Sequence, residues 1–313
     1  MHWGDLLKQV KQIKLKHGLT VSMLAEEMDG AGVLGAGRVG KAVRLASEML
    51  SNPEYTVFLS LAGPMVPGGL RRIIVDLIEM EFVDVVVSTG ANLVHDMVEA
   101  LGFRHYVGSF RNIDQELRRK GLGRIGDILI SQEAFKRLED WLTQMLEDIP
   151  EDKRQRIASH EILYEIGKRL ADSDSILVKA ANKQVPVLCP NLADSIAGFQ
   201  MWAFSQDHKL LLDPLLDTEK IVEIVFDSKK MGAIILGGGW PKHYTLFSTT
   251  FREGLDCAIQ ITMDRPEPGG LSGASLEEAI SWSKVKSEEN TVTVISDATI
   301  IFPLIISAAL DRV

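Results

Sequence analysis

The sequence has only two cysteines, Cys189 and Cys257, and no apolar run long enough to span a membrane. Two cysteines exclude a disulfide-rich framework and a four-cysteine metal site, and both lie in apolar runs, so we expect buried, reduced thiols in a cytoplasmic protein. The N-terminal stretch is amphipathic and basic, and it lacks the apolar core of a signal peptide. Because no histidines are paired with metal-ligand spacing, we also expect no metal site.

Basic residues are fewer than acidic ones, 34 against 43, and the net charge is −9. No basic stripe is present to neutralise phosphates, which excludes a general nucleic-acid binder. An acidic chain suits a cationic substrate or partner, such as a polyamine or a lysine-rich loop. It equally suits an ordinary soluble protein kept monodisperse by its charge, and the charge balance leaves both interpretations open.

Short apolar runs alternate with amphipathic segments along most of the chain. The expected strands are 56–61, 83–88, 124–130, 185–189, 233–237, 257–262 and 291–296. The expected helices are 69–80, 92–101, 132–147, 153–170, 217–228 and 298–310. This alternation predicts an α/β fold, a doubly wound and mostly parallel sheet with helices on both faces. Since no linker or repeat interrupts the pattern, we expect one domain over residues 1–313, with an N-terminal helical extension over residues 1–30.

Small and short polar residues follow four of the expected strands. They are the segments 88–90, 191–194, 237–239 and 296–298. Ligands of open parallel sheets bind beyond the carboxyl ends of the strands. Any one of these segments alone would be an ordinary turn, but four together favour a cleft whose backbone groups bind a nucleotide.

Two stretches match the pattern G-x-G-x-x-G, at residues 35–40 and 121–126. A dinucleotide-binding loop of this type follows a strand and opens a helix. The first stretch has no room for a preceding strand, and the second follows the polar helix-like segment QELRRK. We therefore predict that neither is a dinucleotide loop.

The segment 269–286, GGLSGASLEEAISWSKVK, has the composition of a ligand-binding turn that leads into a helix. Glycines let a backbone approach a ligand closely, and Ser275 followed by Glu278 has the spacing of a capping box. We expect the helix to carry Glu278, Trp282 and Lys284 within three turns. A lysine in a partly desolvated pocket can attack a carbonyl or imine carbon. The alternative is a surface helix with an ordinary solvated lysine.

This segment resembles the active-site segment of the deoxyhypusine synthase family, which reads SGA, a short spacer, EA, Val or Ile, SW, one residue and Lys. The resemblance continues, in the family's order, through 83–101, 124–130, 186–195, 231–243 and 294–305. Together these segments extend from about residue 30 to the C-terminus. The chain is therefore identified as a member of this family.

The resemblance implies a reaction in which NAD oxidises spermidine at its secondary amine. A lysine of the enzyme then carries the four-carbon imine, the group passes to one lysine of the hypusine-containing translation factor, and the bound NADH reduces the product. The lysine that matches the nucleophile is Lys284, and the histidine that matches the proton-abstracting base is His243. Family members are homotetramers built from tight dimers, with each active site between two subunits.

The resemblance also assigns the binding residues. The residues matched to substrate binding are Glu278, Trp282, Gly269 and His95, and those matched to NAD are Thr89, Gly90, Asp194, Asp297 and Ala298. Asp194 has an alternative interpretation as the cap of the helix over 195–204. His243 follows Pro241 near the expected start of a helix, where a neutral imidazole is favoured.

The positions matched to polyamine binding depart from the pattern of eukaryotic members. They carry acidic residues at the positions of Val94, His95, Phe199, Pro268 and Leu271. Fewer carboxylates should weaken the binding of a fully charged polyamine, and the sequence GGLSGA resembles archaeal and bacterial members. Three alternatives therefore stay open: homospermidine synthase-like transfer to a small amine, an NAD-dependent amine oxidoreductase, and a non-catalytic paralogue. The retained lysine, tryptophan and histidine argue against the last.

Overall fold

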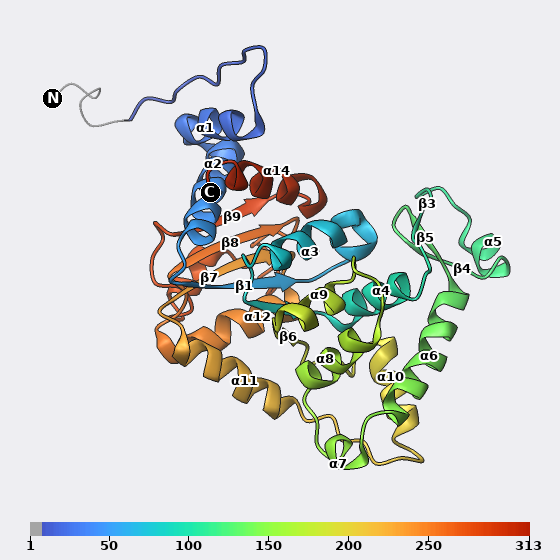
Figure 1. The fold of residues 1–313 in the computed structure, drawn as a ribbon. Coiled ribbons are helices and arrows are strands. Elements are labelled where there is room, and N and C mark those ends of the chain that lie inside the picture. Colours follow the sequence, from blue (N-terminus) through green and yellow to red (C-terminus); the bar gives the residue numbers. More distant parts are fainter. Residues whose placement is uncertain (1–7) are drawn as a thin grey trace.

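The computed structural model describes residues 8–313, and its centre is a six-stranded parallel sheet (Figure 1). The strand order is β6-β2-β1-β7-β8-β9. The strands are β1 Tyr55–Leu61, β2 Val85–Ser88, β6 Val187–Leu188, β7 Lys230–Leu236, β8 Cys257–Thr262 and β9 Thr291–Ile295. Six of the seven expected strands lie in this sheet, which confirms the predicted parallel architecture.

Helices cover both faces of this sheet. The N-terminal half contributes α1 Val21–Ala31, α2 Leu34–Ser51, α3 Arg71–Glu79, α4 Gly90–Ala100, α5 Asp114–Arg119 and α6 Gln132–Glu147, with a π-helical turn at Val66–Leu70. The C-terminal half contributes α7 Glu151–Arg154, α8 Ser159–Arg169, α9 Ile176–Lys183, α10 Ile196–Phe204, α11 Pro214–Asp227, α12 Gly239–Ser248, α13 Leu276–Ile280 and α14 Ala298–Leu310, with a 3₁₀ turn at Thr249–Arg252. The helices expected over 132–147 and 298–310 coincide with α6 and α14.

The strands are apolar on both faces because helices pack on each side. In β1, Leu59 and Leu61 belong to the core under α2, α3 and α14, whereas Phe58 points into the core under α11 and α12. This alternation is what the pleat of a strand produces. The register pairs Leu61 with both Ser88 of β2 and Leu236 of β7. The carboxyl ends of the central strands are therefore aligned at one edge of the sheet.

The strand expected over 124–130 is not part of the main sheet, and that prediction was wrong. The segment forms an antiparallel hairpin of β4 Leu122–Ile125 and β5 Ile128–Ser131, which joins β3 Tyr106–Val107 in a separate three-stranded sheet. Gly126, with a φ of 62°, makes the turn between them. The hairpin projects from the body of the molecule in Figure 1.

Two expected helical regions also differ from the prediction. The helix expected over 153–170 is divided into α7 and α8, because Ile157 pairs with Leu212 in a parallel bridge and its backbone is extended. The helical extension expected over 1–30 is helical only in α1, which begins at Val21 after the cap Thr20. Residues 8–20 contain no helix, and residues 1–7 lie outside the described residues. The single domain over 1–313 stays a prediction.

The two G-x-G-x-x-G stretches have structural explanations. The first lies inside α2, where a Cβ atom on Gly40 would be 2.3 Å from the backbone nitrogen of Asp29. Its glycines thus permit close packing of α1 on α2. The second stretch lies in the β4–β5 hairpin. Neither stretch connects a strand to a helix, in agreement with the prediction.

Among residues 8–313, no helix combines the length and apolar character needed to cross a membrane.

Candidate active site

The aligned strand ends bring the starts of three helices together. Helix α4 follows β2, α12 follows β7 and α14 follows β9. The hydroxyl of Thr89 caps α4 by accepting from the backbone N–H of Asn92, and the carboxylate of Asp297 caps α14 by accepting from the N–H of Thr299 at 2.8 Å. Helix N-termini carry partial positive charge and free N–H groups. This edge of the sheet therefore favours an anionic ligand.

Two adjoining cavities lie along this edge. One, of about 420 Å³, is bordered by four of the predicted residues, Thr89, Gly90, His95 and Asp194. We call it the first cavity. The second cavity, of about 800 Å³, is bordered by Asp297 and Ala298. Both cavities share the wall residues Gly63, Pro64 and Ile125. The structure thus places all five predicted cofactor residues along one continuous cleft.

The projecting hairpin forms part of the cleft wall, which the sequence-based analysis did not predict. Residues 125–128, at the tip of the β4–β5 turn, border the second cavity together with Phe110. The expectation of one short buried strand over 124–130 fails at Gly126, which is the sequence signal for the turn. The tip of the hairpin therefore borders the cleft, whereas Ile130 of β5 packs in the hydrophobic core.

Asp194 does not cap α10, so that alternative was wrong. The cap is Ser195, whose hydroxyl oxygen accepts from the backbone N–H of Gly198 at 3.1 Å. The Asp194 side chain is exposed in the first cavity and makes no hydrogen bond with the rest of residues 8–313. Gly90 lies against Ser195, where an added Cβ atom would be only 2.7 Å from the serine Cβ. The Asp194 carboxylate is therefore available to a ligand.

The segment 269–286 docks directly on the loop between β7 and α12. The backbone N–H of Gly239 donates to the hydroxyl oxygen of Ser272 at 2.8 Å. The side-chain amide of Gln260 donates to the carbonyl oxygens of Gly237 and Ser272, at 3.0 and 2.9 Å. An added Cβ atom on Gly238 would lie 2.5 Å from the Cα of Ser272. Two motifs that are separated in the sequence therefore form one surface.

The helix predicted after Ser275 exists but is shorter than expected. The Ser275 hydroxyl accepts from the N–H of Glu278 at 3.3 Å, as the capping spacing predicts. Helix α13 ends at Ile280, so Trp282 and Lys284 lie in the following loop, and the three-turn helix was a wrong expectation. The chain leaves the helix because the carbonyl oxygen of Lys284 accepts from the backbone N–H of Leu255 at 3.0 Å.

The Lys284 ammonium group lies 5.7 Å from the centre of the Trp282 ring, within cation–π range. The Trp282 side chain itself is 67% exposed. Burial lowers the pKa of His243, and the charge of Lys284 lowers it further. The lowered pKa agrees with the prediction that His243 is neutral. The causes are burial and a neighbouring cation, whereas the prediction gave the start of a helix as the cause. The nucleophile and the base predicted from the sequence lie within electrostatic reach of each other.

Sequence reasoning missed Lys242, which is 1% exposed. Its ammonium group donates hydrogen bonds to the carbonyl oxygens of Leu271 and Ala274, so it joins α12 to the glycine-rich segment. Burial lowers its pKa to about 8; Glu278 opposes this shift and Lys284 adds to it. The only sequence signal was its position on the apolar face of α12, one turn before Leu246.

The structure does not bring the two predicted groups of residues into one cavity. Lys284, Glu278, Trp282, Gly269 and His243 border neither of the two cavities of the cleft. Trp240, one turn before His243 on α12, is the neighbouring side chain that borders the first cavity. Within one chain, the nucleophile side and the cofactor side therefore adjoin through α12 and the β7–α12 loop without sharing a cavity.

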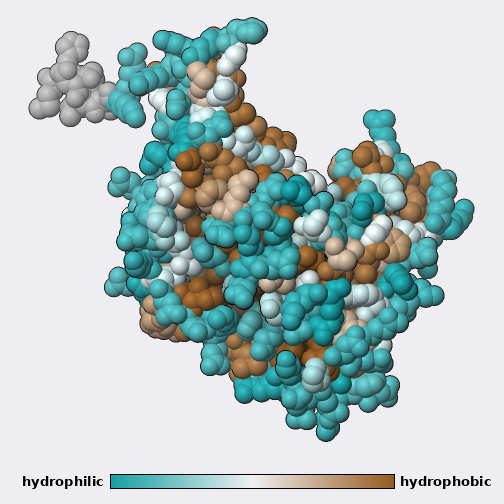
Figure 2. Space-filling view, in the orientation of Figure 1, coloured by the Kyte–Doolittle hydropathy of each residue, from teal (hydrophilic) through white to brown (hydrophobic). Residues whose placement is uncertain are grey.

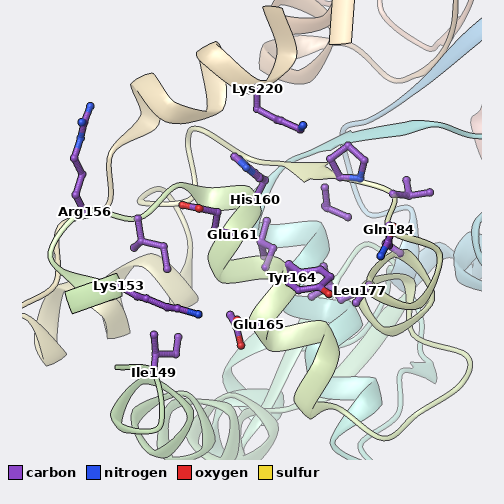
Figure 3. Close-up of a pocket in the computed structure, with 17 residues that line it drawn as sticks. Ile149, Lys153, Arg156, His160, Glu161, Tyr164, Glu165, Leu177, Gln184 and Lys220 are labelled. Carbon is purple, nitrogen blue, oxygen red and sulfur yellow. The ribbon is translucent and has the colours of Figure 1, made fainter. Parts of the chain in front are cut away.

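A separate cavity of about 530 Å³ lies between α8, α9 and the amino end of β6 (Figure 3). It contains none of the predicted site residues and lies at the end of β6 opposite to the cleft. Its polar wall includes His160, whose Nδ1 atom bonds to the buried Asp217 carboxylate at 2.8 Å. Asp217 also accepts from the backbone N–H groups of Ser159 and His160, so this pair caps α8.

Metal-ligating side chains do not gather in the described part of the chain. Residues 8–313 contain no group of three or more histidine, cysteine or acidic side chains with the arrangement of a metal site. Cys189 and Cys257 are both buried, as predicted, and burial raises the pKa of Cys257 to about 12. Neither thiol faces the cleft.

The parallel sheet, the cleft at its carboxyl edge and the neighbouring lysine and histidine define an α/β enzyme. The sequence model of the deoxyhypusine synthase family matches residues 23–309, and the chain belongs to this family. A relative from Methanothermobacter thermautotrophicus, described as "probable deoxyhypusine synthase", is 45% identical over 98% of this chain and 99% of its own length. A second, from Archaeoglobus fulgidus, is 41% identical over 97% and 98%.

The fold has a solved counterpart in a candidate deoxyhypusine synthase from Entamoeba histolytica. The TM-score is 0.65 at 20% identity, and 94% of each chain is covered. This likeness supports the fold alone. Membership of the family makes the chain a transferase of the aminobutyl group in hypusine biosynthesis.

Proposed function

We propose that this protein uses NAD to oxidise spermidine and transfers the 4-aminobutyl group, through Lys284, to a lysine of the hypusine-containing translation factor. The observation that carries the proposal is the placement of Lys284 beside Trp282 and within electrostatic reach of His243. A lysine, an aromatic wall and a base that favours the neutral form are the groups such a transfer needs. The cleft for the cofactor adjoins them through α12.

The residues of the cleft fit NAD. The N-termini of α4 and α14 offer free N–H groups and positive dipole ends to a pyrophosphate. The exposed carboxylates of Asp194 and Asp297 suit ribose hydroxyls, and Gly63 and Gly90 keep the walls close to the backbone. When bound, NAD supplies the hydride acceptor for amine oxidation. Thr89 and Ala298 complete the predicted cofactor set.

The protein groups have distinct roles in this proposal. Neutral His243 accepts a proton from the secondary amine of the substrate, because its depressed pKa keeps Nδ1 or Nε2 unprotonated. The Lys284 amine attacks the imine carbon of the oxidised substrate and holds the four-carbon group as a new imine, while the diamine part leaves. Trp282 packs beside the carbon chain, and Glu278 faces its terminal amine.

We also propose a homotetramer of tight dimers in which a second chain completes each site. Two features support it: the Lys284 group borders neither cavity of its own chain, and β3 and the loop that follows it, beside the hairpin, expose large apolar side chains. Val107 is 97% exposed and Phe110 is 73% exposed, and Figure 2 shows apolar surface on the projecting hairpin. Such exposed apolar area is typical of protein interfaces. Sedimentation at micromolar concentration tests the assembly, and a monomer would contradict it.

One experiment tests the function and its alternatives. The protein is incubated with NAD and radiolabelled spermidine, together with either the translation factor or putrescine. We expect label on the translation factor. Label in homospermidine would favour transfer to a small amine, which the apolar residues Phe199 and Leu271 leave as the second candidate. Oxidation of spermidine without any transfer would favour a plain amine oxidoreductase. The cytoplasmic location stays a prediction.

A further inference from the structure

His95 presents an unpartnered ring nitrogen at the first cavity. The residue lies on the second turn of α4, borders that cavity and is half-buried. Its Nδ1 atom is 2.9 Å from Nε2 of His105, and its ring packs edge-on against Phe135 of α6. Its Nε2 atom makes no hydrogen bond with the rest of residues 8–313. One polar atom is therefore free to meet a ligand.

The inner nitrogen of His95 is the end of a hydrogen-bonded chain. His105 bonds through Nδ1 to an oxygen of Glu99 at 2.6 Å, and the other Glu99 oxygen is 3.3 Å from the Arg71 guanidinium. Arg71 is buried and is held by the carboxylates of Asp96 and Asp172, at 2.7 and 2.9 Å. Because each member is anchored by the next, the two imidazole rings have fixed positions.

Charge determines which atoms of this series of hydrogen-bonded side chains carry protons. Burial alone would raise the pKa of Glu99, but the hydrogen bond from His105 and the charge of Arg71 outweigh it and lower the pKa. Glu99 is therefore a carboxylate that only accepts. Burial, with the neighbouring His105, lowers the pKa of His95 to about 4. The two rings share one hydrogen bond, so a proton on His105 fixes where His95 carries its hydrogen.

The proton on His105 then decides the role of the free nitrogen on His95. With Glu99 accepting, Nδ1 of His105 carries hydrogen. In neutral His105 the other nitrogen must accept, so His95 donates from Nδ1 and its Nε2 is a bare acceptor. In protonated His105, Nε2 donates to His95, whose remaining hydrogen must then move to Nε2. The free nitrogen of His95, a residue that borders the first cavity, changes from acceptor to donor.

We propose that the His105–Glu99 pair is a positioning device that keeps His95 an acceptor for an amine of the polyamine substrate, and that protonation of His105 withdraws this acceptor. The identity of the ligand rests on the proposed function, whereas the tautomer relay rests on the geometry alone. An alkyl ammonium group has only donors, so it requires an acceptor and is repelled by a nearby imidazolium.

The relay is tested first without any ligand. Nitrogen-15 NMR of histidine-labelled protein reports which ring nitrogen carries hydrogen. We expect His95 with hydrogen on Nδ1 at neutral pH, moving to Nε2 as His105 is protonated. The other charged groups around the pair are Arg71, Arg104, Asp96, Asp172 and Glu99. Hydrogen bonds and neighbouring cations outweigh burial and hold the pKa of Glu99 and of Asp172 below its ordinary value, so neither carboxylate changes protonation in the range of the test. A His95 that keeps its hydrogen on Nε2 throughout would overturn the relay.

The role in substrate binding is tested by spermidine affinity across the same pH range. Spermidine amines stay charged there, as lysine does, so the ligand contributes no titration. We expect affinity of the wild-type protein to fall by about tenfold or more as His105 is protonated. The His105→Gln variant, whose amide reaches the position of Nε2, should lose this pH dependence. The His105→Asn variant keeps the contact with Glu99 and loses the contact with His95, so it should bind spermidine more weakly at every pH.

Two controls separate the outcomes. The His17→Asn variant should keep the pH dependence of spermidine affinity, since this exposed histidine lies outside both the cleft and the relay. A His105→Gln variant with the wild-type pH profile would overturn the proposal. If the NMR result is as expected but spermidine does not bind at any pH, the relay stands and the assignment of the polyamine substrate fails.

Discussion

The ammonium group of Lys242 donates a hydrogen bond to the carbonyl oxygen of Leu271, 3.1 Å away. It also donates to the carbonyl oxygen of Ala274, so one buried cation joins α12 to the turn that precedes α13. A buried ammonium is costly unless its donors are satisfied. The orientation of the whole segment from Gly269 to Lys284 therefore depends on a side chain that reaches no ligand cavity.

Replacing Lys242 with Met should uncouple this segment from α12. The substitution keeps length and apolar volume but leaves the two carbonyl oxygens without a donor, at a cost of about 1–3 kcal/mol in unfolding free energy. We expect aminobutyl transfer to fall by about tenfold or more, while NAD affinity, measured by calorimetry, stays near the wild-type value. The exposed Lys136→Met is the matched control. Normal transfer in Lys242→Met would show that the contact is only structural.

Lys284→Arg should abolish transfer and leave NAD binding intact. Arginine keeps the charge and nearly the length, but its guanidinium is not a nucleophile at neutral pH. In the wild-type protein, borohydride added during turnover should trap a four-carbon adduct on Lys284, identified by peptide mass analysis. An adduct on another residue, or normal transfer by the arginine variant, would show that Lys284 does not carry the four-carbon group.

Asp194 and Asp297 offer a paired test of the cofactor site. Either residue changed to Ala should weaken NAD binding by about 1–3 kcal/mol if its carboxylate accepts a ribose hydroxyl. Asp297 also caps α14, so its loss should cost a further ~1 kcal/mol in stability. Asp194 caps no helix, and Asp194→Ala should unfold at the wild-type urea concentration. Unchanged NAD affinity in both variants would contradict the placement of the cofactor.

The stability of the protein should depend on pH through His95. Its pKa is about 4 in the folded protein and about 6.5 in the unfolded chain. Between these values the unfolded chain binds more protons, so the free energy of unfolding rises with pH, by up to about 3 kcal/mol. His95→Leu should flatten this part of the profile in urea unfolding between pH 4 and 7. A slope equal to that of the wild type would show that other groups produce it.

The central sheet was predictable because each of its strands is a local apolar run. Residues 85–88 are buried along their whole length, and a strand covered on both faces must be apolar on both. The hairpin was not predictable by the same rule. Ile128 and Ile130 follow the same pattern as a buried strand, but the turn at Gly126 folds the run back on itself, and its apolar side chains face the cleft and α6.

The sequence alone determined the strands of the central sheet and the family, since these depend on local patterns and on motif spacing. It also predicted Lys284, His243 and the strand-end residues as the site. The tertiary structure decided that α13 ends at Ile280, that Lys242 is buried, and that His95 is bonded to His105. Each of these depends on a hydrogen bond to a residue of another segment of the chain. Local periodicity reports the burial of a face, whereas hydrogen-bond partners depend on how the elements are packed.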